Sequence, residues 1–173
     1  MIMDREILLG ITGMQWEMMD DGEQKTEDAE AVEMLTSADY FFKNGKHYFV
    51  YDETSGSGRK IGKSKIKITG DRIVEIMKAG EMRGGLFFEK DKRTLTCYET
   101  PYGQLHFGVW TTGIDVDVKE DEILAEICYR MEMEDKPMAD CCVKIHACSK
   151  GEKSAQMVRE LMEHQKQDLI KAE

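Results

Sequence analysis

The sequence predicts an all-β protein: an antiparallel up-and-down barrel of about eight to ten strands, followed by one C-terminal α-helix. Three observations predict this class. Apolar and polar residues alternate with period two as far as residue 149, which is typical of strands with one buried and one solvated face. Short polar turns separate these segments, so consecutive strands should pair as hairpins. A helical period follows, and we expect residues 1–150 to form the barrel and residues 151–173 the helix.

The alternation and the turns define the strands in chain order. In residues 32–42 the even-numbered positions are largely apolar. In residues 123–133 the odd-numbered positions are apolar. Asn44-Gly45 suits a two-residue hairpin turn in which both central residues have positive φ. Gly70-Asp71 indicates another tight hairpin, while residues 90–93 and 119–122 are polar breaks between strands.

The segment Thr100-Pro101-Tyr102-Gly103 predicts a corner between two strands. Proline presets φ for the second position of a type I turn, and glycine accepts a left-handed φ at the fourth. A type I turn followed by a left-handed glycine forms a three-residue hairpin loop with a bulge. The composition of this segment is therefore explained by architecture, without a catalytic role.

Two long strands change parity beside a glycine. The apolar positions are odd-numbered in residues 105–109 and even-numbered in residues 114–118, after Gly113. They are likewise odd in residues 7–11 and even in residues 14–18, after Gly13. A change of parity within a strand needs an extra residue, so we predict a β-bulge near each glycine. Bulged strands in meander order favour a curved barrel over a sandwich.

The end of the chain predicts a helix over residues 152–171. Ser149 and Glu152 fit a capping box, and an apolar stripe follows. Its members are Val158, Leu161, Met162, Gln165 and Leu169. We expect this stripe to dock the helix on the barrel or on a partner.

Several segments together resemble the YwiB-like family, a bacterial domain of unknown function found mainly in Firmicutes. They are Tyr48–Glu53, Lys65–Ile68, Lys78–Gly80, Tyr98–Gly103, Trp110–Thr112 and Ile127–Tyr129. The motif Y-x-T-P-Y-G at 98–103 is the most specific. The resemblance covers roughly residues 5–149 and implies a lipocalin-like (calycin) β-barrel, but no known activity. Lys78 stands where the family usually has arginine.

Composition limits the function classes. The formal net charge of −10 argues against nucleic acid and against an anionic membrane surface as partners. We expect a cytoplasmic protein, because the chain shows neither a signal peptide nor a long apolar run. Five cysteines, two of them adjacent, make a poor disulfide framework and indicate reduced thiols. The acidic stretch 17–33 and the basic stretch 59–67 are interpreted as solvated faces; the alternative is that the basic stretch binds an anion or a neighbouring chain.

No catalytic, metal or cofactor site is predicted. Cys142, His146 and Cys148 share one strand face, but they lack the spacing of a four-ligand zinc site. His106 lies near Glu99 in sequence and could form an acid–base pair with it, but no nucleophile or known motif accompanies them.

We therefore expect a non-enzymatic barrel that binds a small apolar or amphipathic ligand in its mouth. The expected ligand-binding residues are Tyr98, Tyr102, His106, Phe107 and Trp110. Barrels of about eight strands hold either packed side chains or one small ligand. The alternative is a barrel filled by side chains that acts as a protein-interaction or homodimerisation module, and the third reading is an enzyme with an unrecognised site.

Overall fold

The computed structural model describes residues 5–18 and 30–171, so most of the predicted acidic loop lies outside the described residues. The strands are β1 (Glu6–Glu17), β2 (Glu30–Lys43), β3 (Lys46–Thr54), β4 (Lys60–Thr69), β5 (Ile73–Gly80), β6 (Gly84–Glu89), β7 (Arg93–Thr100), β8 (Gly103–Val118), β9 (Glu122–Met133) and β10 (Lys136–Ser149). The helix is α1 (Glu152–Lys171). The predicted class of a strand-built barrel with one terminal helix is confirmed.

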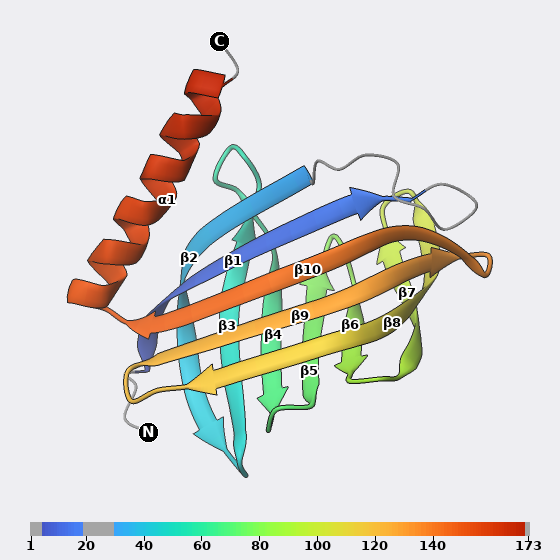
Figure 1. Ribbon diagram of the computed structural model, residues 1–173, viewed down its shortest axis with the longest axis horizontal. Coiled ribbons are helices and arrows are strands. Elements are labelled where there is room, and N and C mark those ends of the chain that lie inside the picture. Colours follow the sequence, from blue (N-terminus) through green and yellow to red (C-terminus); the bar gives the residue numbers. More distant parts are fainter. Residues whose placement is uncertain (1–4, 19–29, 172–173) are drawn as a thin grey trace.

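All ten strands belong to one antiparallel sheet. Each strand pairs with its neighbour in the chain except across β6 and β7, and β1 also pairs with β10. Figure 1 shows β1, β10, β9 and β8 forming one layer that crosses the strands of the opposite layer. Because the first and last strands pair, the meander curls into a nearly closed barrel with a single seam between β6 and β7.

Few contacts link β6 to β7 across the seam. One isolated bridge joins Arg83 to Glu99, with N···O distances of 2.9 and 2.7 Å. Beyond it, Thr94 Oγ1 donates to the Phe87 carbonyl at 2.8 Å and Thr96 Oγ1 donates to the Gly85 carbonyl at 3.2 Å. Threonine hydroxyls thus satisfy carbonyl groups that a backbone ladder would otherwise pair.

The predicted turns are mostly confirmed. Asn44 and Gly45 have φ of 53° and 74°, as the type I′ hairpin requires. Gly103 has the predicted positive φ of 123°. Its hairpin is one residue tighter than expected, because Thr100 pairs directly with Gly103. The Thr100 hydroxyl donates to the Gly103 carbonyl at 2.8 Å and accepts from the Tyr102 N–H at 3.1 Å, which holds the corner closed.

One of the two predicted bulges is present. The register of β8 against β9 shifts between Thr111 and Gly113, and the buried positions change from odd to even there. The prediction for β1 is wrong, since its pairing with β2 and β10 runs without a shift. The apolar residue Met14 therefore stays on the outer face of the barrel, opposite to Ile7 and Leu9, which are fully buried.

Side chains fill the barrel interior. The largest fully buried ones include Phe49, Phe88 and a series of isoleucines. Aromatic rings contact one another across it: Phe88 packs on Tyr129 at 4.8 Å between centroids, and Tyr98 meets Phe107 edge-on at 5.6 Å. Such pairs add to the stability that comes from burial of their area.

Helix α1 is confirmed, but its docking residues differ from those predicted. Met157 is buried, Val158 and Leu161 are half-buried, and Met162 is 64% exposed. The side chain of Leu169 lies outside the described residues. Met157 sits over Gly10 of β1, where an added Cβ would lie 3.2 Å from its sulfur. The absence of a side chain at Gly10 therefore makes room for the helix.

The predicted capping box is wrong, because Ser149 is the last residue of β10. The helix begins after Gly151, whose N–H donates to the Ser154 hydroxyl at 2.8 Å. Lys153 also contacts Asp121 at 2.7 Å, which ties the first turn to the β8–β9 connection. These contacts place the start of α1 against the outside of the barrel.

Candidate functional site

One end of the barrel interior holds a group of polar side chains, here called the tyrosine cluster: Tyr51, Glu53, Ser64, Lys78, Tyr98 and Tyr129. The Glu53 carboxylate accepts hydrogen bonds from Lys78 Nζ at 2.6 Å and from Ser64 Oγ at 2.8 Å. These residues come from β3, β4, β5, β7 and β9. The strand alternation that points their neighbours into the core points these polar groups inward as well.

Burial shifts the pKa values in the tyrosine cluster. Burial, assisted by Glu53, raises the pKa of Tyr51 and of Tyr98 to about 12. Burial also raises the pKa of Glu53, but the hydrogen bonds from Lys78 and Ser64 outweigh it, so the net pKa is lowered. The cluster therefore contains neutral phenols beside an ion pair at neutral pH.

The Tyr98 hydroxyl has no hydrogen-bond partner among the described residues, although only 7% of the residue is exposed. Gly84 of β6 lies against its ring, and a Cβ built on that glycine would collide with Tyr98 Cδ1. The ring is therefore fixed at the seam while its hydroxyl is left unsatisfied. Removing this hydroxyl should cost little stability, because no hydrogen bond would be lost.

The five residues predicted to bind a ligand do not converge on one pocket. Tyr98 and Phe107 contact each other inside the barrel. Tyr102 is 99% exposed at the tip of the corner, and Trp110 is exposed on the outside. His106 is also exposed, and its Nε2 lies 3.9 Å from Cys97 Sγ. His106 is the cross-strand partner of Cys97, and among the described residues no hydrogen bond or ion pair joins it to Glu99, the acid considered from sequence.

A cleft of about 710 Å³ lies outside the barrel, between α1 and the outer face of the sheet. Its apolar lining comes from Met14 of β1, Leu35 of β2, Leu124 of β9, and Met157 and Leu161 of α1. In Figure 1 the helix lies beside β1 and β2, on the outside of the sheet. Pockets that hold small molecules are typically of about this size, 300–1,000 Å³, and are mostly apolar with a few polar groups.

The polar lining of this cleft is predominantly acidic. Five carboxylates face one lysine, Lys144; the carboxylates are Glu33, Asp115, Asp117, Glu126 and Glu160. Lys144 Nζ lies 3.9 Å from Glu126, and His164 Nδ1 lies 3.8 Å from Glu33. Asp115 has no opposite charge within ion-pair distance among the described residues. The cleft thus combines an apolar floor with a negative rim.

The sequence did not predict this cleft, although the apolar residue Met14, at an even-numbered position, could have indicated an apolar surface on the outer face. Its even position among odd apolar neighbours predicted a bulge, whereas Met14 is outward-facing and lines the cleft. Distinguishing the two cases requires the position of α1, which lies more than a hundred residues away in sequence.

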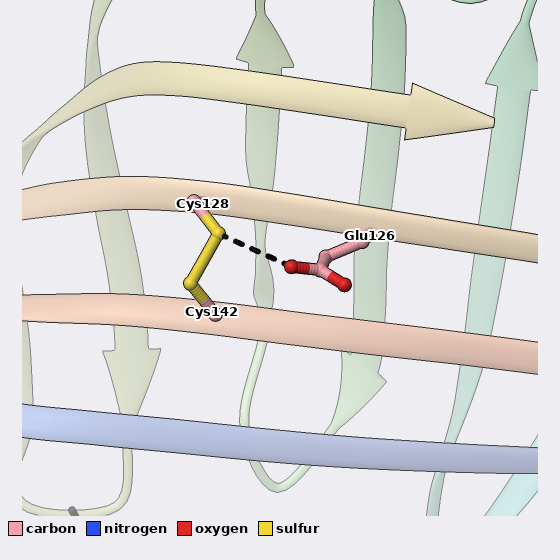
Figure 2. A group of neighbouring side chains, drawn as sticks. All are labelled: Glu126, Cys128 and Cys142. Atoms are coloured by element: carbon pink, nitrogen blue, oxygen red, sulfur yellow. Dashed lines mark hydrogen bonds between the residues drawn. A yellow bond between two sulfur atoms is a disulfide. The ribbon is translucent and has the colours of Figure 1, made fainter.

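The expectation of reduced thiols is wrong for Cys128 and Cys142, which form a disulfide (Figure 2). They are directly opposite in the antiparallel β9–β10 pair, with Cα atoms 4.2 Å apart. Adjacent strand residues point to opposite faces, so Cys141 points inward and is free and buried. Spacing alone could not reveal this pairing, because it depends on strand register.

The three same-face residues considered for zinc lie in different surroundings. Cys142 is in the disulfide, and His146 Nε2 lies 2.7 Å from Glu122 Oε2. Cys148 is buried, and burial together with Glu122 and Asp121 raises the pKa of its thiol to about 11. The structure does not bring these three residues together as a ligand set.

The basic stretch 59–67 is largely neutralised by its surroundings. Arg59 contacts Glu81 at 2.8 Å, Lys60 contacts Asp52 at 3.2 Å, and Lys67 contacts Glu75 at 3.4 Å. The Nζ atoms of Lys65 and Lys67 also lie over the ring of Tyr48, 6.0 and 5.9 Å from its centroid. These contacts support the interpretation of a solvated strand face.

The fold and its filled interior define a ten-stranded antiparallel barrel with an external helix-covered cleft. The chain belongs to the family described as Domain of unknown function (DUF1934), whose model matches residues 18–145. The crystal structure of the ywiB protein from Bacillus subtilis has a similar fold, with a TM-score of 0.61 and 24% sequence identity over 83% of this chain and 93% of that chain. No curated protein matches the sequence. The YwiB-like resemblance is therefore confirmed. No helix within the described residues is long and apolar enough to cross a membrane.

Proposed function

We propose that this protein is a non-enzymatic, lipocalin-like binding barrel that holds a small amphipathic cation in the cleft between α1 and the sheet. The observation that carries the proposal is the 710 Å³ cleft itself, with apolar side chains beneath a rim of five carboxylates. An apolar tail would bury area against Met14, Leu35 and Leu161. An ammonium group would meet Asp115, which has no ion-pair partner within the part of the chain that the structure describes.

We place the ligand site outside the barrel because packed side chains occupy the barrel interior. Fully buried residues such as Phe49, Phe88 and Val109 fill the space that a lipocalin ligand would occupy. The predicted mouth residues Tyr102, His106 and Trp110 remain candidates only for an external contact. The absence of an enzymatic activity, a cytoplasmic location and the homodimer remain predictions of the sequence.

A matched set of probes tests the ligand chemistry. Octylamine, octanol and octanoate share one tail and differ in head group, so calorimetric titration of the full chain isolates the effect of charge. We expect octylamine to bind about tenfold more tightly than octanoate, which corresponds to about 1.4 kcal/mol. Equal affinities, or no binding of any probe, would contradict the proposal.

Variants locate the site. Replacing Asp115 and Asp117 together by asparagine should weaken octylamine binding severalfold, because the rim loses two negative charges. Asp71→Asn, in the β4–β5 turn, is the matched control and should leave binding unchanged. If Trp110→Ala weakened binding and the double rim variant did not, the mouth residues predicted from sequence would be the site.

A further inference from the structure

The outer face of the β9–β10 hairpin carries a second group of reactive side chains, formed by Glu126, Cys128 and Cys142 (Figure 2). One potential ligand atom from each residue lies within 4.8 Å of the others. A Glu126 carboxylate oxygen lies 3.8 Å from Cys128 Sγ. Both cysteines are half-buried and Glu126 is exposed, so solvent and small reagents reach this face.

We propose that this face is a redox-gated metal site, in which reduction of the Cys128–Cys142 disulfide creates a binding site for one Zn²⁺ ion. Two thiolates and the Glu126 carboxylate would supply three protein ligands, with water as the fourth. Zinc accepts sulfur and carboxylate oxygen in tetrahedral sites, and three protein ligands plus water is a common open arrangement. Soft thiolates favour zinc over magnesium or calcium, which prefer oxygen ligands.

The chemistry balances with a thiol reductant. A cellular dithiol transfers two electrons and two protons to the disulfide; the Cys128–Cys142 bond breaks, two thiols form, and the dithiol becomes a disulfide. Zinc binding then releases both thiol protons, because the thiolate is the metal ligand. The oxidised protein has no thiolate at this position and should not bind the ion there.

The surrounding hairpin can keep these residues together after the disulfide opens. Cys128 and Cys142 lie in the middle of a backbone ladder that runs from the Cys148–Glu122 pair to the Lys136–Met133 pair. The Thr112 hydroxyl also donates to the Cys128 carbonyl at 3.0 Å, at the bulge of β8. Lys144 would compete with the metal ion for Glu126, because its Nζ lies 3.9 Å from the Glu126 carboxylate. Both side chains are about half exposed, and such surface ion pairs are weak.

Metal titration of the full chain tests the proposal. Protein reduced with a phosphine is desalted without oxygen and titrated with Zn²⁺ against a chromophoric chelator. Cd²⁺ serves as a second probe, because its thiolate complexes absorb in the ultraviolet. We expect one equivalent of either metal for reduced protein and none for oxidised protein. Circular dichroism of the reduced sample checks that the barrel stays folded.

Three variants assign the ligands. Cys142→Ser should abolish binding, and Glu126→Gln should weaken it at least about tenfold, since even outer-shell partners of metal ligands cause losses of that size. Cys97→Ser, which removes an exposed thiol elsewhere on the barrel, should bind metal normally. The proposal is overturned if folded, reduced wild-type protein takes up no metal, if Cys142→Ser binds as wild type does, or if Cys97→Ser abolishes binding.

Discussion

The ion pair inside the tyrosine cluster gives the sharpest stability prediction. Lys78→Met keeps most of the aliphatic stem and removes the ammonium group that Glu53 contacts at 2.6 Å. The side chains are only 26% and 22% exposed, so water replaces the lost hydrogen bond poorly. A hydrogen bond to a charged group contributes about 1.5–3 kcal/mol. Ser64 still satisfies the carboxylate in part, and we therefore expect a loss of about 2 kcal/mol in the free energy of unfolding.

Thermal unfolding at neutral pH measures this loss. A domain of this size shifts its Tm by about 2–4 °C per kcal/mol, so Lys78→Met should melt about 4–8 °C lower. Lys60→Met is the matched control, because Lys60 pairs with Asp52 at 3.2 Å on the surface with both side chains more than half exposed. Exposed pairs contribute about 0–1 kcal/mol, so the control should change little.

The same pair of variants has a pH signature. The folded pKa of Glu53 is lowered from 4.5, so its stabilising contribution is present above that pH and is lost as pH falls through the folded pKa. The gap between wild type and Lys78→Met should therefore narrow under acidic conditions. Equal losses in Lys78→Met and Lys60→Met, or a gap that is independent of pH, would refute the reasoning.

Three further predictions concern the tyrosines and the corner. Tyr98→Phe should leave stability unchanged or raise it by up to about 1 kcal/mol, because its hydroxyl has no hydrogen-bond partner among residues 5–18 and 30–171. Tyr40→Phe should instead cost about 1 kcal/mol by removing a 2.8 Å hydrogen bond to His47. Chemical denaturation compares the two variants, and a larger loss in Tyr98→Phe contradicts the assignment. Gly103→Val should lower the free energy of unfolding by about 1 kcal/mol or more, since a β-branched residue resists a φ of 123°. An unchanged Tm would show that the corner does not require glycine at this position. The raised pKa values of Tyr51 and Tyr98, about 12 each against 10.0, mean that their contributions are complete below pH 10 and are lost between about pH 10 and 12. Burial also raises the pKa of Tyr40 and of Tyr129, so ultraviolet titration should show a group of late-forming phenolates, one of which Tyr98→Phe removes. Early ionisation of Tyr51 and Tyr98 would count against the buried cluster.

Local patterns in the sequence were sufficient for much of the fold. Period-two alternation, the Asn44-Gly45 turn and the parity change at Gly113 each report on neighbours within a few residues, and each is confirmed by the pairing of strands. The Y-x-T-P-Y-G motif carried the resemblance to the family, and the structure places its proline and glycine at the corner and its first tyrosine inside the barrel. These features depend on short-range geometry, which a sequence displays directly.

The candidate sites depend on long-range geometry, and there the sequence was insufficient. Met14 lines a cleft only because α1 returns to cover β1. Cys128 and Cys142 meet only because the β9–β10 register sets them opposite each other. The mouth residues failed to converge because odd and even positions of β8 face opposite sides, which separates Phe107 from His106 and Trp110.

The methionine methyl groups offer the most direct test of the binding cleft. In protein labelled at the methionine methyls, octylamine should shift the signals of Met14 and Met157, which line the cleft. The signals of Met77 and Met82, exposed elsewhere on the barrel, should stay in place and serve as internal controls. Saturating shifts confined to the methionines that line the cleft, which also include Met34, would support the account. Unmoved Met14 and Met157 signals, or shifts of Met77 and Met82 as large as theirs, would contradict it.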